Sequence, residues 1–346
     1  MTLDLELVGD ELSKILLLGF GAFVLSMTLT PVYTHFMFKH KWYKVQRTET
    51  STGEVAKIFH KLHKKKHENG GLPTMSGLIF IVSAVIVTIL FNWTRSQTYL
   101  PLTAFVGAGL IGLLDDVINI KGLGSGVAGI RKGMKFTLML AVSLAASLYF
   151  YYKLGNYDSF NLTFYGDVSI GWLMVPLFML VIVSTANAVN ISDGLDGLSG
   201  GLLTSAFSAF GAIAMLQGNY GIAGFCFTIV GILMAYVWFN IHPARFMMGD
   251  VGSFSMGTAL GVVAMLTDTL VLLPVIGFVF VVETGSSALQ ILSKKIRGKK
   301  IFKVAPIHHH FEAIGWPETK VTMRFWLIGQ VMAIVGIVLA IIGGHI

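Results

Sequence analysis

Acidic side chains beside apolar stretches are the first candidates for chemistry in this sequence. Asp115 and Asp116 directly follow the run Gly112-Leu113-Leu114. Two adjacent carboxylates at such a boundary repel each other unless protons or a cation separate them. A solvated helix end is the simpler explanation for a single aspartate, but the pair favours a functional site.

A second cluster contains Asn190, Asp193 and Asp196, each three residues from the next. If this stretch is helical, the spacing predicts that neighbouring members lie on one face. The interleaved Gly194 and Gly197 permit close backbone approach to a ligand. No Lys or Arg lies within the stretch, so an ion or a ligand is favoured over a local salt bridge. A polar loop that closes two spans is the alternative.

Two further clusters lie later in the chain. Asp250 stands within Met248–Ser253, which alone could be an ordinary glycine turn. Three consecutive histidines, His308, His309 and His310, cannot all point one way from a helix or strand. Their order argues against one zinc site made of all three, and leaves one or two of them to contact phosphate or a carboxylate.

The composition indicates the kind of element that must position these residues. Of 346 residues, 54% are hydrophobic and 12% are charged, whereas soluble domains carry about 25% charged residues. This balance excludes a soluble globular domain and intrinsic disorder, and is typical of a polytopic membrane protein. A lone cysteine, Cys226, excludes an intrachain disulfide and a cysteine-based metal cluster.

Apolar stretches near the length of a membrane span predict an all-α fold of about ten transmembrane helices in a single domain, residues 1–346. A small hairpin is expected near Ser159–Ile170. The third and eighth stretches are short, so polar turns could extend them. The ten stretches are Ile15–Phe38, Met75–Phe91, Leu100–Leu114, Phe136–Tyr152, Ile170–Ala188, Leu198–Leu216, Ile222–Phe239, Phe254–Leu266, Leu270–Leu292 and Phe325–Ile342.

The charges divide unequally between the two ends of these spans. Ten spans place both termini on one side of the membrane. The segments on that side contain 3 basic and 7 acidic residues, and the segments on the other side contain 22 basic and 11 acidic residues. The net charge of +7 is therefore −4 on the first side and +11 on the second. The positive-inside rule predicts that the second side is cytoplasmic and that both termini lie outside.

All four polar clusters fall on the predicted cytoplasmic side. Their carboxylates and amides suit a hard cation such as Mg²⁺, which takes oxygen ligands and often shares them with substrate phosphates. Nearby basic residues suit an anionic partner; they are Lys121, Arg131, Lys132, Lys135, Lys294 and Lys295. The combination at a membrane face predicts phosphoryl transfer that involves a lipid.

Three other features are open to more than one interpretation. Glu283 lies within an apolar stretch and is either functional or part of a hydrogen-bonded packing contact. Gln290, nearer the cytoplasmic end, is better placed to contact a ligand. The basic loop Lys57–His67 is interpreted as a topology signal that contacts lipid headgroups, in preference to a catalytic segment.

At these residues the sequence resembles the phospho-N-acetylmuramoyl-pentapeptide transferases of bacterial cell-wall synthesis, within the polyprenyl-phosphate N-acetylhexosamine-1-phosphate transferases. The likeness runs in order from Pro73 to about Trp326. It rests on the aspartate pair, the Asn/Asp-Gly-Leu-Asp-Gly motif, Phe239-Asn240 and Met248–Ser253. Most specific is Ala305–Glu312 with the following Gly-Trp-Pro-Glu, which separates the muramoyl-pentapeptide branch from the N-acetylglucosamine-1-phosphate branch.

The resemblance implies a reaction in the bacterial cytoplasmic (inner) membrane. Undecaprenyl phosphate attacks the β-phosphorus of UDP-N-acetylmuramoyl-pentapeptide, UMP leaves, and lipid I forms. The implied partners are these two substrates and membrane lipids, with no nucleic acid, and a homodimer is left open. The rivals are transfer of another UDP-N-acetylhexosamine, a membrane transporter, and an inactive homologue. The one-sided carboxylates and the absence of an evident inverted repeat argue against a transporter.

The resemblance also implies roles for individual residues. Asp250 is expected to bind Mg²⁺ with Asp115 and Asp116 nearby, and one member of that pair to deprotonate or position the lipid phosphate. The other catalytic candidates are Lys135, His308 and His309. Residues expected in the nucleotide and inhibitor pocket are Asn190, Asp193, Asp196, Asn240, Met247, Gln290 and His310.

The sequence departs from the family pattern before the second apolar stretch and beside Asp250. Asn69 stands where the family has a lysine, and Leu72 and Ser76 also differ from the pattern. Met247 replaces a phenylalanine that stacks on uracil, although a thioether still packs on a ring face. Because every carboxylate of the pattern is present, the departures indicate a divergent member.

Overall fold

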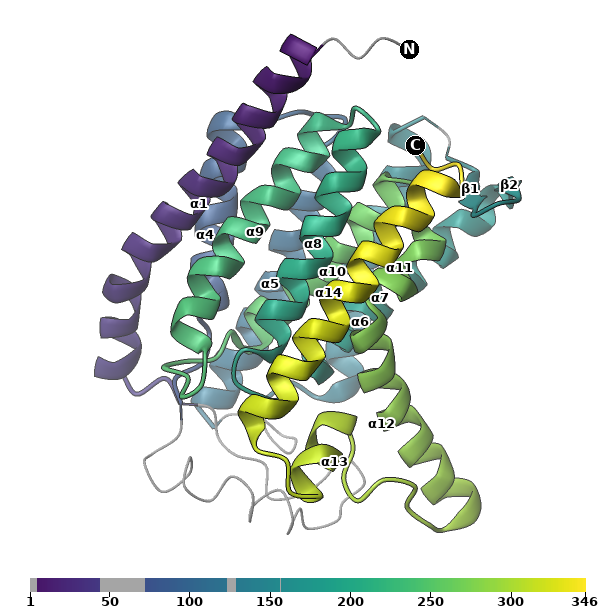
Figure 1. Cartoon of the computed structure of the whole chain (residues 1–346). Helices are drawn as coiled ribbons and strands as arrows, with labels where there is room; N and C mark the ends of the chain where they lie inside the picture. Colours follow the sequence, from purple (N-terminus) through teal and green to yellow (C-terminus); the bar gives the residue numbers. More distant parts are fainter. Residues whose placement is uncertain (1–4, 44–71, 123–128, 156) are drawn as a thin grey trace.

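The computed structural model describes residues 5–43, 72–122, 129–155 and 157–346 and is almost entirely helical (Figure 1). The predicted loop Lys57–His67 and Asn69 lie outside the described residues. The first half of the described chain contains α1 (Leu5–Lys39), α4 (Gly77–Phe91), α5 (Tyr99–Ile120), α6 (Lys132–Lys153), β1 (Ser159–Leu162), β2 (Gly166–Ser169) and η1 (Gly171–Leu173). The second half contains α7 (Met174–Ser192), α8 (Leu198–Leu216), α9 (Tyr220–Asn240), α10 (Gly249–Leu266), η2 (Leu270–Leu272), α11 (Leu273–Ile276), α12 (Phe278–Arg297), α13 (Ile307–Ala313) and α14 (Glu318–Ile342).

The helices confirm a polytopic membrane protein. Within the described residues, 8 helices are long and apolar enough to cross a membrane, or 9 when one bent pair is counted as a span. A further apolar helix, α4, has 15 residues. Each of the ten predicted stretches therefore contains helix, although not every one forms an uninterrupted membrane-length helix. The two short stretches continue through their polar neighbours, so α5 reaches Ile120 and α10 begins at Gly249.

The ninth stretch, Leu270–Leu292, is predicted to be one straight span, and this prediction is wrong because the helix is broken and bent. The chain forms η2 and α11, then turns by 81° into α12. Pro274 lies in the first turn of α11 and Gly277 at the break. Their effect on helix direction is invisible to a count of apolar residues. As a result, α12 leans away from the bundle in Figure 1.

Helix α10 lies at the centre of the bundle, where nearly every side chain is buried. It packs against α5 and α7. A Cβ at Gly112 of α5 would lie 2.2 Å from the carbonyl oxygen of Asp250, and one at Gly77 of α4 would lie 2.2 Å from the nitrogen of Gly252. Small residues at such crossings let membrane helices approach closely. These glycines bring α4 and α5 against the beginning of α10.

The predicted hairpin is also confirmed. Strands β1 and β2 pair antiparallel, with Ser159 opposite Ser169 and Leu162 opposite Gly166. The backbone N–H of Asn161 donates to Asp268 Oδ1 at 3.0 Å, which ties the hairpin to the turn after α10. The hairpin therefore marks the end of the bundle that lies away from α13 (Figure 1).

The two ends of α1 define the two ends of the bundle. In Figure 1 its first described turn lies at the end that also holds the C-terminus, while its last turn lies toward the opposite end, above α13. The beginning of α1 and the C-terminus therefore lie at the same end of the bundle, as the predicted even number of spans requires. Which end faces the cytoplasm, and the single-domain organisation, remain predictions.

The crossing of α1 and α9 generates a prediction about stability. A Cβ at Gly231 would lie 2.0 Å from the carbonyl oxygen of Gly19, so Gly231→Ala must push the two helices apart. Overpacking of this kind costs about 1–3 kcal/mol. We expect a clear fall in the thermal unfolding temperature of the purified protein in detergent.

Gly21→Ala is the matched control for this prediction, because nothing lies within 4 Å of a Cβ built at Gly21. Alanine is also the better helix former, by about 1 kcal/mol. The control should unfold at the same temperature as the unchanged protein or slightly higher. Equal unfolding temperatures for the two variants would contradict the tight crossing.

Candidate active site

Three aspartates lie where the end of α5 meets the beginning of α10. Asp115, Asp116 and Asp250 are 1%, 0% and 4% exposed. The sequence placed the first two beyond the end of an apolar stretch, whereas the structure places them inside helix α5. They are therefore buried carboxylates, which require compensation by cations or hydrogen-bond donors.

Lys135, near the start of α6, supplies that compensation for two of them. Its Nζ lies 3.1 Å from Asp115 Oδ2 and also forms a close ion pair with Asp250 Oδ2. The backbone N–H of Ile130 donates to Asp115 Oδ1 at 2.8 Å. The ammonium group also lies 4.5 Å from the ring centroid of Phe254. One lysine thus joins α5, α6 and α10.

Asp116 faces the beginning of α10. Its Oδ2 accepts a hydrogen bond from the backbone N–H of Val251 at 3.2 Å. A carboxylate is favoured at this position because the first N–H groups of a helix carry partial positive charge. Gly249 has φ of +71°, and a Cβ there would lie 2.4 Å from Asp116 Oδ2. Only glycine meets both requirements without strain.

Asn190 is brought to the same place from the end of α7. Its Nδ2 donates to Ser253 Oγ at 2.8 Å and lies 3.3 Å from Asp250 Oδ1. The structure therefore unites residues from the aspartate pair, the second cluster and the third cluster. Asn190, Asp115 and Asp250 are the members whose side chains converge.

The expectation that Asn190, Asp193 and Asp196 share a helical face is wrong. Helix α7 ends at Ser192, Asp193 caps it, and Gly197 adopts a left-handed φ of +75° before α8. Helical spacing therefore does not apply beyond Asp193. Asp196 lies in the turn and meets a different set of partners.

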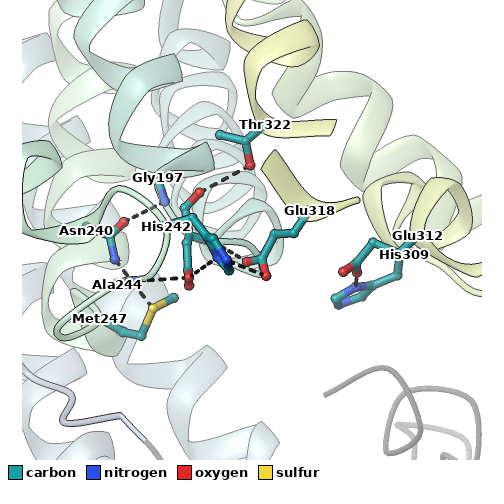
Figure 2. A network of polar contacts seen from close by, with 10 residues as sticks. Gly197, Asn240, His242, Ala244, Met247, His309, Glu312, Glu318 and Thr322 are labelled. Atoms are coloured by element: carbon teal, nitrogen blue, oxygen red, sulfur yellow. Dashed lines mark hydrogen bonds and ion pairs between the residues drawn. The ribbon is translucent and has the colours of Figure 1, made fainter. Parts of the chain in front are cut away.

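Those partners form a network that joins three segments (Figure 2). Asp196 Oδ2 lies 3.0 Å from His242 Nδ1 and accepts the backbone N–H of Ala244 at 3.1 Å. Glu318, at the start of α14, lies 3.6 Å from the same histidine nitrogen and accepts the backbone N–H of Asp196 at 2.8 Å. Thr322 donates to the carbonyl oxygen of Asp196 at 3.2 Å. His242 was not a candidate in the sequence; its place between Asn240 and Arg245 was the available signal.

Asn240 and Met247 lie beside this network. Asn240 Oδ1 accepts the backbone N–H of Gly197 at 2.9 Å, and its Nδ2 donates to the carbonyl oxygen of Phe246 at 2.8 Å. Met247 Sδ lies 3.6 Å from the same Nδ2, and Ser76 Oγ donates to the Met247 carbonyl oxygen at 2.9 Å. Two of the departures from the family pattern, Ser76 and Met247, are therefore in direct contact.

The three histidines point to different neighbours, as predicted. His308 Nδ1 lies 2.7 Å from Glu283 Oε2, and both side chains are fully buried. A Cβ at Gly194 would lie 2.3 Å from His308 Nε2, so the imidazole packs directly on the turn after α7. His309 pairs with Glu312 at 2.7 Å, and His310 Nδ1 accepts the backbone N–H of Lys303 at 3.1 Å.

Gln290 organises the segment between α12 and α13. Its Oε1 accepts the backbone N–H groups of Ile301 and Phe302, both at 3.0 Å, and its Nε2 donates to the carbonyl oxygen of Phe302 at 3.0 Å. The side chain is 7% exposed. Gln290 is thus bound to the loop that leads to the histidines.

Two groups of side chains were compared as candidate metal ligands. Among the described residues, Asp196, His242 and Glu318 offer three ligand atoms that lie within 4.8 Å of one another. Asp115, Asp116 and Asp250 offer only oxygen donors, and Lys135 forms ion pairs with two of them. A hard oxygen-seeking cation such as Mg²⁺ fits the second group better, because no nitrogen donor is involved.

Comparison with known proteins found relatives that match nearly the whole chain and a family model that matches its central part. Residues 98–268 match the family model described as glycosyl transferase family 4. A phospho-N-acetylmuramoyl-pentapeptide-transferase of Chloroflexus aggregans is 39% identical over 97% of this chain and 92% of its own length. Proteins of the same name from Geobacillus sp. and Anoxybacillus flavithermus are each 37% identical, over 91% and 94% of this chain. They cover 94% and 97% of their own lengths, and none of these matches supports a homodimer.

His309 generates a prediction about pH. Burial and the neighbouring His308 lower the pKa of His309 from 6.5 to about 4, although Glu312 acts in the opposite direction. The folded protein therefore keeps His309 neutral, while the unfolded chain takes up a proton as the pH falls below about 6.5. Stability from this residue is present above that pH and is lost as the pH falls toward 4.

NMR of protein with isotope-labelled histidine measures this directly. The His309 resonance, identified by its loss in His309→Gln, should titrate near pH 4. In Glu312→Gln the midpoint should fall further, because the group that favours the charged imidazole has been removed. A midpoint near 6.5 in the unchanged protein would refute the assigned environment.

Proposed function

The chain belongs to the family of phospho-N-acetylmuramoyl-pentapeptide-transferases, and we propose that it transfers phospho-N-acetylmuramoyl-pentapeptide from a UDP-linked donor to undecaprenyl phosphate. An oxygen of the lipid phosphate attacks the β-phosphorus of the donor. The bond from that phosphorus to the bridging oxygen breaks, and the electron pair leaves with UMP. The product is lipid I, a lipid-linked pyrophosphoryl sugar, so the chain is a phosphosugar transferase of peptidoglycan synthesis.

The observation that carries the proposal is the convergence of Asp115, Lys135 and Asp250 at one end of the bundle. Phosphoryl transfer depends mainly on positioning and on charge stabilisation, and less on covalent chemistry by the protein. Buried carboxylates beside an ammonium group, at the level where the helices end, provide a charged centre close to a lipid surface. This arrangement suits an anionic lipid acceptor and a soluble donor that meet at the membrane face.

We assign the aspartates as follows. Asp250, with Asp115 and Asp116, would hold Mg²⁺, which neutralises charge on the donor phosphates when it is bound. One member of the Asp115–Asp116 pair deprotonates or positions the lipid phosphate. Lys135 keeps two of the carboxylates oriented and balances part of their charge.

The remaining candidates belong to the donor side of the reaction. We propose that His308 and His309 act on the donor side, and the packing of His308 against the turn at Gly194 supports this assignment because that turn belongs to the second polar cluster. The nucleotide and the rest of the donor would be bound around the surrounding loops, by Asn190, Asp193, Asp196, Asn240, Met247, Gln290 and His310. Several of these act through the loops they hold, as the contacts of Gln290 with the backbone near Phe302 illustrate.

The proposed location is the bacterial inner membrane, with the aspartate end of the bundle in the cytoplasm and both termini outside. The charge distribution supports this orientation, since 22 of the 25 basic residues fall on the proposed cytoplasmic side. UDP-linked donors are soluble, so the donor would enter from that side. The two ends of α1 agree with this relative arrangement (Figure 1).

Two alternative functions, transport and transfer of another UDP-linked sugar, have less support. A transporter would place its charged residues near the midplane of the bilayer, whereas Asp115 lies in the last two turns of α5 and Asp250 in the first turn of α10. Transfer of another UDP-N-acetylhexosamine lacks support from the three relatives described above, each of which carries the muramoyl-pentapeptide name.

The first test measures UMP release. Purified protein is supplied with Mg²⁺, undecaprenyl phosphate and UDP-N-acetylmuramoyl-pentapeptide, and we expect UMP and lipid I in equal amounts. UDP-N-acetylglucosamine, used in parallel, should give no UMP. Turnover of that sugar alone would favour the other hexosamine, and absence of UMP from both donors would reject both enzymatic hypotheses.

The second test removes the proposed metal ligand. Asp250→Ala should lower the rate of UMP release by at least about 10²-fold, the cost typical of losing one preorganised charge-stabilising group. Binding of Mn²⁺, followed by electron paramagnetic resonance as a substitute for Mg²⁺, should weaken as well. Asp167→Ala, an exposed aspartate on β2, is the matched control and should change neither measurement. A near-normal rate in Asp250→Ala would disprove the assigned role.

A further inference from the structure

A basic pocket lies between α1 and the chain that follows α9, and none of the three aspartates lines it. Its volume is about 460 Å³, within the range of about 300–1,000 Å³ found for small-ligand sites. One wall is a single face of α1, formed by Pro31, Thr34, His35 and Phe38 at helical spacing. Helices α1 and α9 pack along each other, and the lining residues lie toward or just after their C-terminal ends, which are the lower ends of the two helices in Figure 1.

The lining combines cations with aromatic rings. Lys39 and Arg245 both face the pocket, and Arg245 lies 6.0 Å from the ring of Phe239. The rings of Phe239 and Phe246 are 5.9 Å apart and form the inner wall. Neither cation forms an ion pair with a carboxylate among the described residues.

Neutralisation of helix dipoles does not account for both cations. Helices α1 and α9 end here, and each C-terminus carries about half a negative charge. Lys39 and Arg245 together carry two positive charges, so among the described residues the pocket keeps a net positive charge. An anionic occupant satisfies that excess.

The surroundings indicate an occupant that comes from the membrane. Trp238 and Ile241, at the same end of α9, are 71% and 51% exposed, and Val32 and Phe36 of α1 are 60% and 47% exposed. An exposed tryptophan at the end of a span is typical of the membrane–water interface. Acyl chains beside such residues would place a lipid headgroup at the level of the cations.

We propose that this pocket binds the phosphate headgroup of an anionic phospholipid, with Lys39 and Arg245 contacting the phosphate and the phenylalanine rings packing against the glycerol and upper acyl chains. The walls of this pocket are α1, α9 and the loop after α9, whereas Asp115 and Asp250 of the proposed reaction belong to α5 and α10.

Binding can be measured without any assay of activity. The protein is reconstituted in nanodiscs of phosphatidylcholine with or without phosphatidylglycerol, and native mass spectrometry then counts the phosphatidylglycerol retained after release. Arg245→Gln and Lys39→Gln should each weaken retention about fivefold, the equivalent of the ~1 kcal/mol typical of one basic residue at an anionic surface. Retention of phosphatidylcholine should not change.

Lys14→Gln is the matched control, since it removes the same charge from the opposite end of α1. It should retain phosphatidylglycerol as the unchanged protein does. Arg245→Lys keeps the charge and should recover most of the binding lost in Arg245→Gln. Thermal unfolding identifies any variant that fails to fold, and Lys39→Gln remains informative in that case because Lys39 makes no ion pair or side-chain hydrogen bond within the described chain.

Two outcomes would overturn the proposal. Equal retention of phosphatidylglycerol in Lys39→Gln, Arg245→Gln and Lys14→Gln would show that the pocket is not its site. Displacement of phosphatidylglycerol by inorganic phosphate alone would assign the pocket to a soluble anion, because the lipid would then gain nothing from the aromatic walls.

Discussion

Burial of charge where α5, α6 and α10 meet is the constraint on which the rest of the site depends. Taking a carboxylate out of water costs several kcal/mol unless cations and donors replace the lost hydration. Lys135 and the N–H groups of Ile130 and Val251 provide that replacement for Asp115 and Asp116. The same contacts fix the relative positions of the three helices. We therefore expect a preorganised site, which is what charge stabilisation in phosphoryl transfer requires.

The glycines explain how the carboxylates come so close to one another. Gly112 lets the backbone of α5 touch the backbone of α10 at Asp250, and Gly249 lets Asp116 approach the first turn of α10. Any larger side chain at these two positions would separate the aspartates. The chain contains 39 glycines against 8 prolines. Some of these glycines thus permit the close approach of the aspartates at the site, in addition to close packing of the helices.

The sequence was sufficient to predict the helices and insufficient to predict how they are connected; the functional role of the polar clusters stays a prediction. Apolar length identified the ten stretches, because burial in lipid requires it, and the aspartates were found because such residues are rare in this composition. The bend at Gly277 could not be predicted, since apolar length says nothing of direction. His242 was missed because a single histidine in a loop carries no spacing signal, and its partners Asp196 and Glu318 are 122 residues apart in the chain.

The network of Asp196, His242 and Glu318 changes how the candidate pocket residues are understood. Asp196 was expected to contact a ligand, yet it holds the backbone of the loop after α9 at Ala244, and Glu318 holds the backbone of the turn before α8 at Asp196. The side chain of His242 lies beside both carboxylates. Asn240 and Gln290 act in the same way on neighbouring loops. Loops that must bind a flexible donor lose less conformational entropy on binding when they are already held. Polar residues of this family pattern can therefore be essential to donor binding without touching the donor, because they set the shape that the donor meets.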